Sequence, residues 1–137
     1  MAKLQYKKII LPPAGKEIYT LLKVEEVENR FYDPKRDKED RATQLEWQFV
    51  LDKNPEISAR TWSTPSLYVF KGKKSKCLRI TETLLDKALK DDEKQEFGDT
   101  DGLIGKKCYL IVKHDKTEDG ATVGKVIDFE SISGLPF

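Results

Sequence analysis

The sequence has few of the residues from which an enzyme builds a reaction centre. It contains two cysteines, one histidine and one methionine in 137 residues. The histidine, His114, is expected at the end of a strand and on the surface. No Cys-x-x-Cys, His-Glu-x-x-His or Gly-x-Ser-x-Gly motif is present. We therefore expect a protein that is not an enzyme, with no catalytic residue and no cofactor.

Cysteine and long hydrophobic runs are also too scarce for several classes of protein. Cys77 and Cys108 lie far apart, so no disulfide scaffold is predicted, and a reducing compartment is expected. No stretch approaches the length needed to span a bilayer, and no apolar run of the secretory type opens the chain. These features predict a cytoplasmic protein with no membrane partner.

Two segments resemble fragments of calcium-binding loops, residues 99–102 and residues 115–120. Neither supplies the full series of oxygen ligands with its closing Glu. We therefore predict no metal site.

The chain has almost no net charge, but its charges are unevenly placed. The formal net charge is +1. Residues 1–16 and residues 69–79 are both rich in Lys and contain no acid, whereas residues 91–101 contain six acids and one lysine. Because the total conceals two basic stretches and an acidic one, the distribution is the better guide to partners.

Alternating apolar residues predict five β-strands and one helix. The strands are expected at Glu17–Phe31, Leu45–Leu51, Ala59–Thr64, Lys107–His114 and Ala121–Ile132. A helix is predicted over Lys76–Lys90, with Ser75 as its N-cap. The apolar parity slips between Val24 and Val27, which indicates a bulge or a strong coil, a feature that suits a strand shared by both sides of a closed barrel. The pattern predicts a mainly β protein, a five-stranded OB-type Greek-key barrel with one helix between strands 3 and 4.

One domain is expected, since the length is typical of a single hydrophobic core. We assign residues 1–16 to a basic N-terminal lead, residues 17–132 to the barrel domain and residues 133–137 to a short C-terminal tip.

Aromatic and cationic residues occur together on and after the third predicted strand. Trp62 shares a strand face with Arg60, and Tyr68 and Phe70 lead into a lysine-rich segment. Binding of single-stranded DNA needs rings on which bases stack and cations along the backbone. The second and third strands of an OB-fold form its usual binding face. The predicted nucleic-acid-binding residues are Arg60, Trp62, Tyr68, Phe70, Lys71, Lys73, Lys74 and Lys76, together with Tyr32 and Trp47.

These residues also have a structural interpretation, in which the aromatics pack in the core or under loops and the lysines are simply solvated. For Trp47, which alternates with Leu45 and Phe49, the core interpretation is favoured. For Trp62, which has polar neighbours, the two interpretations are evenly balanced. Tyr32 belongs to a second candidate contact, the loop after the first strand, where acidic residues dilute the positive charge.

Several segments between residues 11 and 132 are similar to one family when taken together. They are Leu11-Pro12-Pro13-Ala14-Gly15, the strand around Trp47, the helix from Lys76, Gly98-Asp99-Thr100 with Leu103-Ile104-Gly105-Lys106, and the last hairpin. This set resembles bacteriophage single-stranded-DNA-binding proteins of the OB type. The resemblance implies a protein that coats and protects single-stranded DNA in phage replication or recombination, largely independently of sequence, in the cytoplasm of the host cell.

The last residues, Leu135-Pro136-Phe137, are similar to the tip by which bacterial single-strand-binding proteins recruit their partners. The resemblance implies replication proteins as partners through Pro136 and Phe137. A long acidic tail is missing, with only Asp128 and Glu130 before the tip, so a packed or frayed terminus is the alternative.

A non-enzymatic protein-interaction module is the second function class. A phage accessory or inhibitor protein could use the same barrel to hold another protein, which would explain the near-neutral charge better. Its function would survive replacement of Lys73 and Lys74 by Glu. In the DNA-binding interpretation, the acidic residues 91–101 lie away from the DNA or contact a basic patch on a neighbouring copy in a homo-oligomer.

Overall fold

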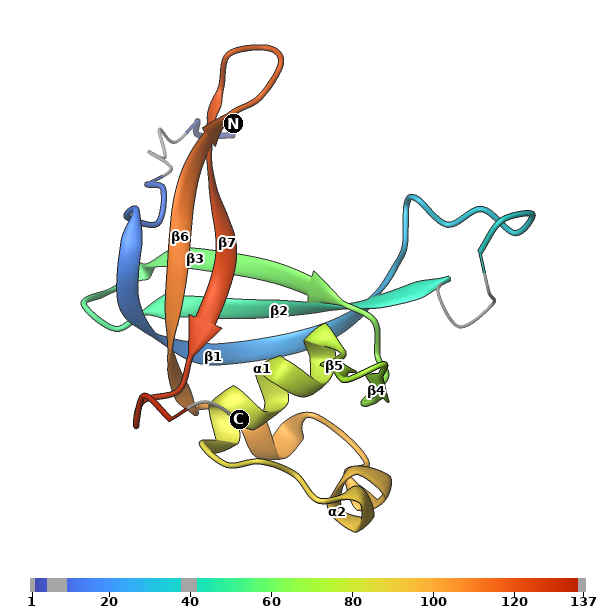
Figure 1. Cartoon of the computed structure of the whole chain (residues 1–137). Helices are drawn as coiled ribbons and strands as arrows, with labels where there is room; N and C mark the ends of the chain where they lie inside the picture. Colours follow the sequence, from blue (N-terminus) through green and yellow to red (C-terminus); the bar gives the residue numbers. More distant parts are fainter. Residues whose placement is uncertain (1, 5–9, 38–41, 136–137) are drawn as a thin grey trace.

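A five-stranded antiparallel sheet forms most of the protein (Figure 1). The structure is a computed structural model, and it describes residues 2–4, 10–37 and 42–135. The strands are β1 (Gly15–Glu28), β2 (Thr43–Leu51), β3 (Asn54–Ser63), β6 (Lys107–Lys116) and β7 (Thr122–Glu130), in the order β3-β2-β1-β6-β7. The predicted mainly β class and the five strands are confirmed.

Strand β1 is long enough to pair with two neighbours. Residues 15–20 pair with β6, and residues 19–28 pair with β2. The register against β2 shifts between Leu21 and Lys23, which makes Leu22 a bulge where the two pairings meet. The predicted bulge in this strand is confirmed, although it lies before the predicted position between Val24 and Val27.

The two edge strands, β3 and β7, approach each other but do not pair. Residues of the two strands are in contact, yet no hydrogen-bonded ladder joins them in the described chain. Beside this seam the register of β6 and β7 shifts at Ile127, a bulge that bends β7. The sheet is therefore strongly coiled and remains open along one seam, so the expectation of a closed barrel is wrong.

The core lies on the inner face of the coiled sheet. Its largest fully buried side chains include Tyr19 and Leu21 of β1, Trp47 and Phe49 of β2, and Leu110 of β6. The helix α1 (Lys76–Leu85) packs Ile80 and Leu84 against the same core. The core therefore occupies the inside of the coil and leaves the outer strand faces free for other roles.

Helix α1 begins as the sequence predicts. The Ser75 hydroxyl accepts a hydrogen bond from the backbone N–H of Leu78 at 3.2 Å, as an N-cap does. The helix ends at Leu85, before the predicted Lys90, because Asp86 adopts a left-handed conformation with φ of 58°.

No helix in the described residues has both the length and the apolar character that crossing a bilayer requires.

Three short elements between β3 and β6 were not predicted. They are the two-stranded hairpin β4 (Val69–Phe70) and β5 (Lys73–Lys74), the helix α2 (Asp91–Glu96) and a 3-10 turn at Asp101–Leu103. The sequence predicts one helix in this region, whereas the structure has two. Strand β3 also begins earlier than predicted, at Asn54, because the β2–β3 turn lies at Asp52 and Lys53.

Candidate nucleic-acid interface

Strand β3 has two chemically different faces. Ala59, Thr61 and Ser63 are buried on its inner face, whereas Arg60 and Trp62 are exposed on its outer face. The indole of Trp62 is 45% exposed. The antiparallel register places Glu46 of β2 opposite Trp62 and Gln48 opposite Arg60. The structure thus brings Arg60 and Trp62 together on an accessible strand face.

Glu46 connects the side chains on this face. Its Oε1 accepts a hydrogen bond from Nη1 of Arg60 at 3.2 Å and another from the Gln48 amide, and its Oε2 accepts one from Nε1 of Trp62 at 3.2 Å. The Glu46 side chain is 13% exposed. This carboxylate holds the indole in place and compensates the charge of Arg60. Sequence analysis did not select Glu46, because its place beside Trp62 depends on the strand register.

A groove of about 460 Å³ opens over this network. We call it the Trp62 groove and define it by its lining residues, Val27, Glu28, Arg30, Phe31, Gln44, Glu46, Arg60 and Trp62. Its aromatic rings are those of Trp62 and of Phe31, which is 83% exposed. Pockets of about 300 to 1,000 Å³ are large enough for small ligands. A planar ring fits the chemistry of this lining, since two aromatic rings and several hydrogen-bonding groups meet there.

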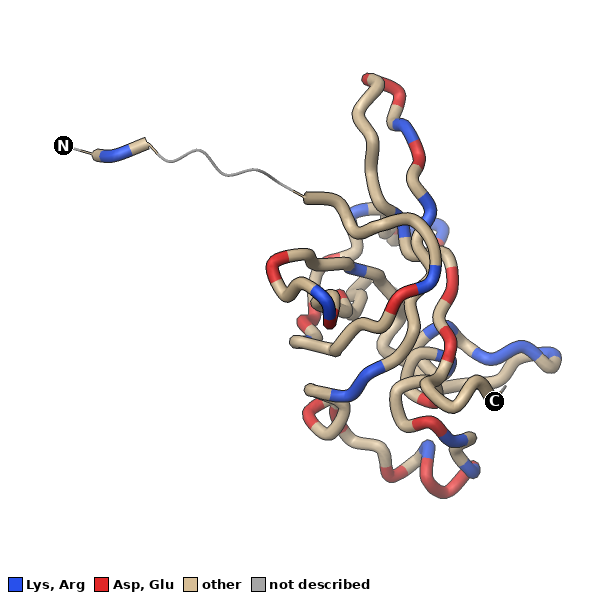
Figure 2. The backbone as a smooth tube through the Cα atoms, turned by 90° about the vertical axis from the view of Figure 1, so that its left-hand side faces the viewer, with Lys and Arg blue, Asp and Glu red and all other residues tan. Residues whose placement is uncertain are grey.

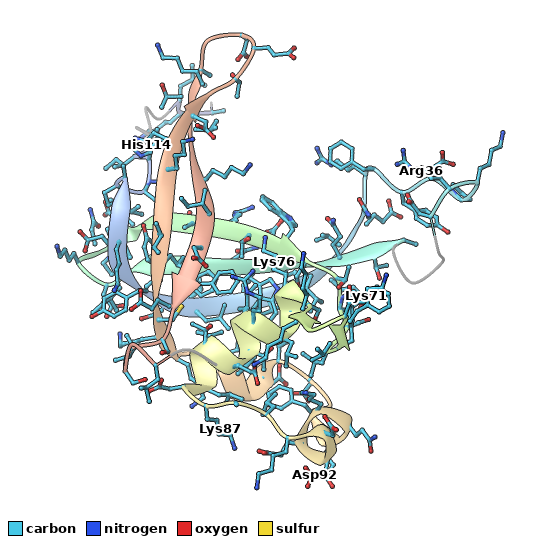
Figure 3. The ribbon with its side chains drawn as sticks, viewed as in Figure 1. Arg36, Lys71, Lys76, Lys87, Asp92 and His114 are labelled. Carbon is cyan, nitrogen blue, oxygen red and sulfur yellow. The ribbon has the colours of Figure 1, made fainter. Side chains whose placement is uncertain are left out.

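Tyr32 lies outside the lining of the Trp62 groove. It is half-buried in the loop between β1 and β2, where its backbone N–H donates to the Asn29 carbonyl at 3.1 Å. Its neighbour Phe31 lines the groove instead. Figure 3 shows Arg36 farther out on this loop, away from the sheet. The part of this loop next to β1 therefore lines the groove.

The β4–β5 hairpin presents aromatic and cationic side chains to solvent. Phe70 is 65% exposed and Tyr68 is 43% exposed. The turn consists of Lys71 and Gly72, whose φ angles are both positive, at 52° and 76°, as in a two-residue hairpin turn. Nζ of Lys71 lies 5.3 Å from the centre of the Phe70 ring. Among the described residues, no acid forms an ion pair with Lys71 or Lys73.

Ser75 fixes this hairpin to the start of α1. Besides capping the helix, its hydroxyl accepts a hydrogen bond from the Tyr68 N–H at 3.3 Å and donates one to the Ser66 carbonyl at 2.8 Å. The Ser75 N–H donates to the Tyr68 carbonyl at 2.8 Å. The hairpin is therefore held at both ends of its base, and its exposed side chains have a defined position.

Lys74 differs from the other lysines of the hairpin. Its Nζ lies 2.7 Å from Oε1 of Glu82 on α1, a carboxylate that is 2% exposed. The other oxygen of Glu82 accepts a hydrogen bond from the Leu89 N–H at 2.6 Å. Residues 69–79 contain no acid, yet the charge of Lys74 is compensated, because the fold places an acid of α1 beside it.

Two further cations, Lys76 of α1 and Lys125 of β7, lie close enough to interact electrostatically. Lys76 is the first residue of α1, and its pKa is lowered mainly by burial and further by the positive charges of Arg79 and Lys125. Arg79 is compensated by Asp128 at 3.1 Å, whereas no acid pairs with Lys76 or Lys125 among the described residues. Figure 3 shows Lys71 and Lys76 near the end of β3. The sequence did not predict Lys125 as a neighbour of the site, because β7 packs beside α1 only in the folded chain.

Trp47 is unavailable to any ligand. It is 0% exposed, and its Nε1 donates a hydrogen bond to the Ser63 hydroxyl at 2.9 Å inside the core. The prediction that Trp47 contacts nucleic acid is wrong, and its core interpretation holds, because Trp47 lies on the inner face of β2.

Charges of both signs are distributed over the whole molecule (Figure 2). The acidic helix α2 lies at the end of the molecule opposite to the β6–β7 turn (Figure 1). The tip residues Pro136 and Phe137 lie outside the described residues, so partner recruitment through them stays a prediction. In the described part of the chain, no three His, Cys, Asp or Glu side chains are grouped so that they could hold a metal ion.

Comparison with known proteins adds no family to this geometry. No protein-family model and no curated protein sequence matches the chain. The function is therefore argued from the surface described above.

Proposed function

We propose that the protein binds single-stranded DNA through the outer face of β2 and β3 and the neighbouring hairpin. The observation that carries this proposal is the exposed indole of Trp62, held by Glu46 over a groove that Phe31 also lines. Successive bases stack on aromatic side chains at about 1 to 3 kcal/mol per base, and any base can do so. An exposed aromatic ring held in one orientation suits this mode of binding.

The topology supports an OB-type assignment. In an OB-fold the barrel is partly open, and the face of strands 2 and 3 binds oligonucleotides together with the loops beside it. Here β1 pairs with both β2 and β6, the seam between β3 and β7 is open, and α1 follows the third strand. The Trp62 groove lies on the strand face that this fold uses for binding.

The unpaired lysines of the β4–β5 hairpin, α1 and β7 provide the electrostatic part of the proposal. Lys71, Lys73, Lys76 and Lys125 are not paired with acids in the described structure, so their charges remain available for phosphates. Phe70 adds a further exposed ring, next to Lys71. In this arrangement bases stack on Trp62 and Phe70, and the backbone follows the lysines. Coating and protecting a phage single strand is the role that the sequence resemblance supports.

A titration of a fluorescent oligo-dT of about 20 nucleotides, followed by anisotropy, tests the proposal. We expect the single strand to bind more tightly than a duplex of equal length. Trp62→Ala should weaken binding about tenfold or more. The double variant Lys71→Ala/Lys73→Ala should reduce the salt slope by about 1.4, since each phosphate contact contributes about 0.7 with single strands.

The matched control for these lysines is Lys87→Ala/Lys94→Ala, on the acidic side of the molecule. Lys87 is paired with Glu93 at 2.8 Å and Lys94 with Asp91 at 3.4 Å, so neither is available to a phosphate. This control should leave affinity and salt slope unchanged. The proposal is overturned if the wild-type protein fails to bind at about 50 mM salt, or if Trp62→Ala binds as tightly as wild type.

The alternative is a protein-interaction module on the same fold. It is favoured by the compensation of Arg60 by Glu46 and of Lys74 by Glu82, which leaves the binding face less basic than its sequence predicts. In this alternative no single strand binds, and replacement of Lys71 and Lys73 by Glu leaves function intact, whereas Lys74 is kept because it neutralises the buried Glu82.

A further inference from the structure

We propose that the Trp62 groove selects guanine over the other bases, so that the protein has a base preference in addition to general affinity for single strands. The inference depends on the proposed function, because a base must first enter the groove. It rests on the carboxylate of Glu46, on the fixed orientation of Trp62 and on the cations of the same lining.

The carboxylate of Glu46 retains acceptor capacity. Two ionised oxygens offer about four lone-pair positions. Oε1 already accepts from Arg60 and Gln48, whereas Oε2 accepts from Trp62 alone among the described residues, so one position is open and a ligand with two donors must also replace Arg60 at Oε1. The Glu46 side chain is 13% exposed and lines the Trp62 groove, so a ligand there can reach it. A ligand that donates hydrogen bonds is therefore favoured at this position.

Guanine is the base whose edge fits a carboxylate best. Its N1–H and its 2-amino group are adjacent, parallel donors, as in the bidentate pairing of an arginine with a carboxylate. Adenine and cytosine place one amino donor beside a ring nitrogen that accepts, and thymine places its single N–H between two carbonyl oxygens. Those acceptor atoms would face the negative charge of Glu46, which costs binding free energy.

The other lining residues are consistent with the same base. Since Nε1 of Trp62 is bonded to Glu46, the indole is held beside the carboxylate that would bind the edge of the stacked base. Arg60, which the guanine edge replaces at Oε1 of Glu46, lines the same groove and can donate to the adjacent O6 carbonyl, and Arg30 can donate to O6 or to a neighbouring phosphate. The groove thus combines a stacking ring, an acceptor for two donors and cations for an acceptor atom.

The test is a set of short oligo-dT strands of about eight nucleotides, each with one central dG, dA, dC, dT or inosine, titrated by anisotropy. We expect the dG strand to bind about tenfold more tightly than the dT, dA and dC strands, the usual size of discrimination by a bidentate contact. The inosine strand lacks the 2-amino group, so it should bind at least about threefold more weakly than the dG strand.

Two variants locate the preference within the molecule. Glu46→Gln keeps the size of the side chain but replaces one acceptor oxygen by an NH2 donor, so the ratio of dG to dT affinity should fall to about one, and the changed contact with Trp62 should weaken all strands alike. Glu25→Gln is the matched control, because Glu25 of β1 is opposite Glu46 on the outer face but does not line the groove. This control should retain the preference.

The outcomes separate this inference from the proposed function. If the wild-type protein binds all five strands equally and Trp62→Ala weakens them all, guanine selection is overturned and DNA binding stands. Tighter binding of the dC strand than of the dG strand also overturns it, since a single amino donor would then suffice. If no strand binds at all, the proposed function fails together with the inference.

Discussion

Trp47 of β2 and Trp62 of β3 lie on neighbouring strands, but their side chains lie on opposite faces of the sheet. Trp47 is opposite Thr61 on the inner face of the sheet, and Trp62 is opposite Glu46 on the outer face. Each indole N–H has a hydrogen-bond partner, yet Trp47 is 0% exposed and Trp62 is 45% exposed. The comparison teaches that strand parity, which residue type alone does not reveal, decides whether a tryptophan stabilises the core or is available to a ligand.

The inner and outer faces of the sheet also differ in their electrostatics. On the inner face, burial raises the pKa of Tyr19 to about 12 and that of Cys108 to about 12. On the outer face, Glu46 and Arg60 form an ion pair at the surface. Changes on the inner face should therefore alter stability, and changes on the outer face should alter binding.

Replacing each tryptophan by alanine is the most direct test of this contrast. Trp47→Ala should lower the free energy of unfolding by about 3 to 5 kcal/mol, because it leaves a large cavity in the core. Trp62→Ala should lower it by less than about 1 kcal/mol, although it weakens DNA binding. Urea unfolding followed by circular dichroism measures both values. Similar losses in the two variants would show that the two faces are not distinct.

High pH should destabilise the inner face. In the unfolded chain tyrosine ionises near pH 10 and the cysteine thiol near pH 9, whereas Tyr19 and Cys108 stay protonated in the fold until about pH 12. Because the folded pKa values are raised, stability is complete below pH 9 and falls as the pH rises to 12. Tyr19 alone should account for about 3 kcal/mol of this loss.

Urea unfolding at a series of pH values between 8 and about 11.5 measures this loss. Tyr19→Phe is the control, since it removes the tyrosine part of the slope. Unfolding free energy that is constant over the whole range would contradict the burial of these two groups.

Two carboxylates provide a smaller test of the same contrast. Glu82→Gln should lower the free energy of unfolding by about 2 to 3 kcal/mol, because it removes the buried charge that binds Lys74 and the Leu89 N–H. Glu46→Gln should lower it less, by about 1 kcal/mol, because the partner Arg60 is 53% exposed and the remaining amide oxygen still accepts a hydrogen bond. Thermal unfolding of the two variants side by side distinguishes them, and equal effects would refute the distinction.

The smallest effect is expected from the hydroxyl of Tyr19. This buried oxygen has no hydrogen-bond partner among the described residues. Tyr19→Phe removes a polar atom that burial penalises, so at pH 7 the variant should be at least as stable as wild type, within about 1 kcal/mol. A loss of about 2 kcal/mol or more in thermal unfolding would show that the hydroxyl has a partner in solution.

Much of the sheet could be predicted from the sequence, because its strands have one buried face and therefore alternate. The elements that the sequence did not predict lack a periodic pattern of apolar residues. The strands of the β4–β5 hairpin have two residues each, too few for a period, and α2 has no buried residue and hence no apolar stripe. Strand β3 contains Pro55, which reads as a terminator but is tolerated because β3 is an edge strand.

The candidate site was predictable only in part. Arg60, Trp62 and Phe70 could be selected because aromatic and cationic residues cluster along the chain. Glu46 and Lys125 could not, since they become neighbours of the site through strand register and the packing of β7 against α1. Compensation of a lysine by a distant acid is equally invisible in the sequence, because it depends on the tertiary fold.

The open seam leaves β1 as the strand that joins the two halves of the sheet. In the described chain, β1 alone is hydrogen-bonded to both halves of the sheet, β2 with β3 on one side and β6 with β7 on the other. In native-state hydrogen exchange, amide protons should be retained longest in the middle of β1 and lost first along the facing edges of β3 and β7.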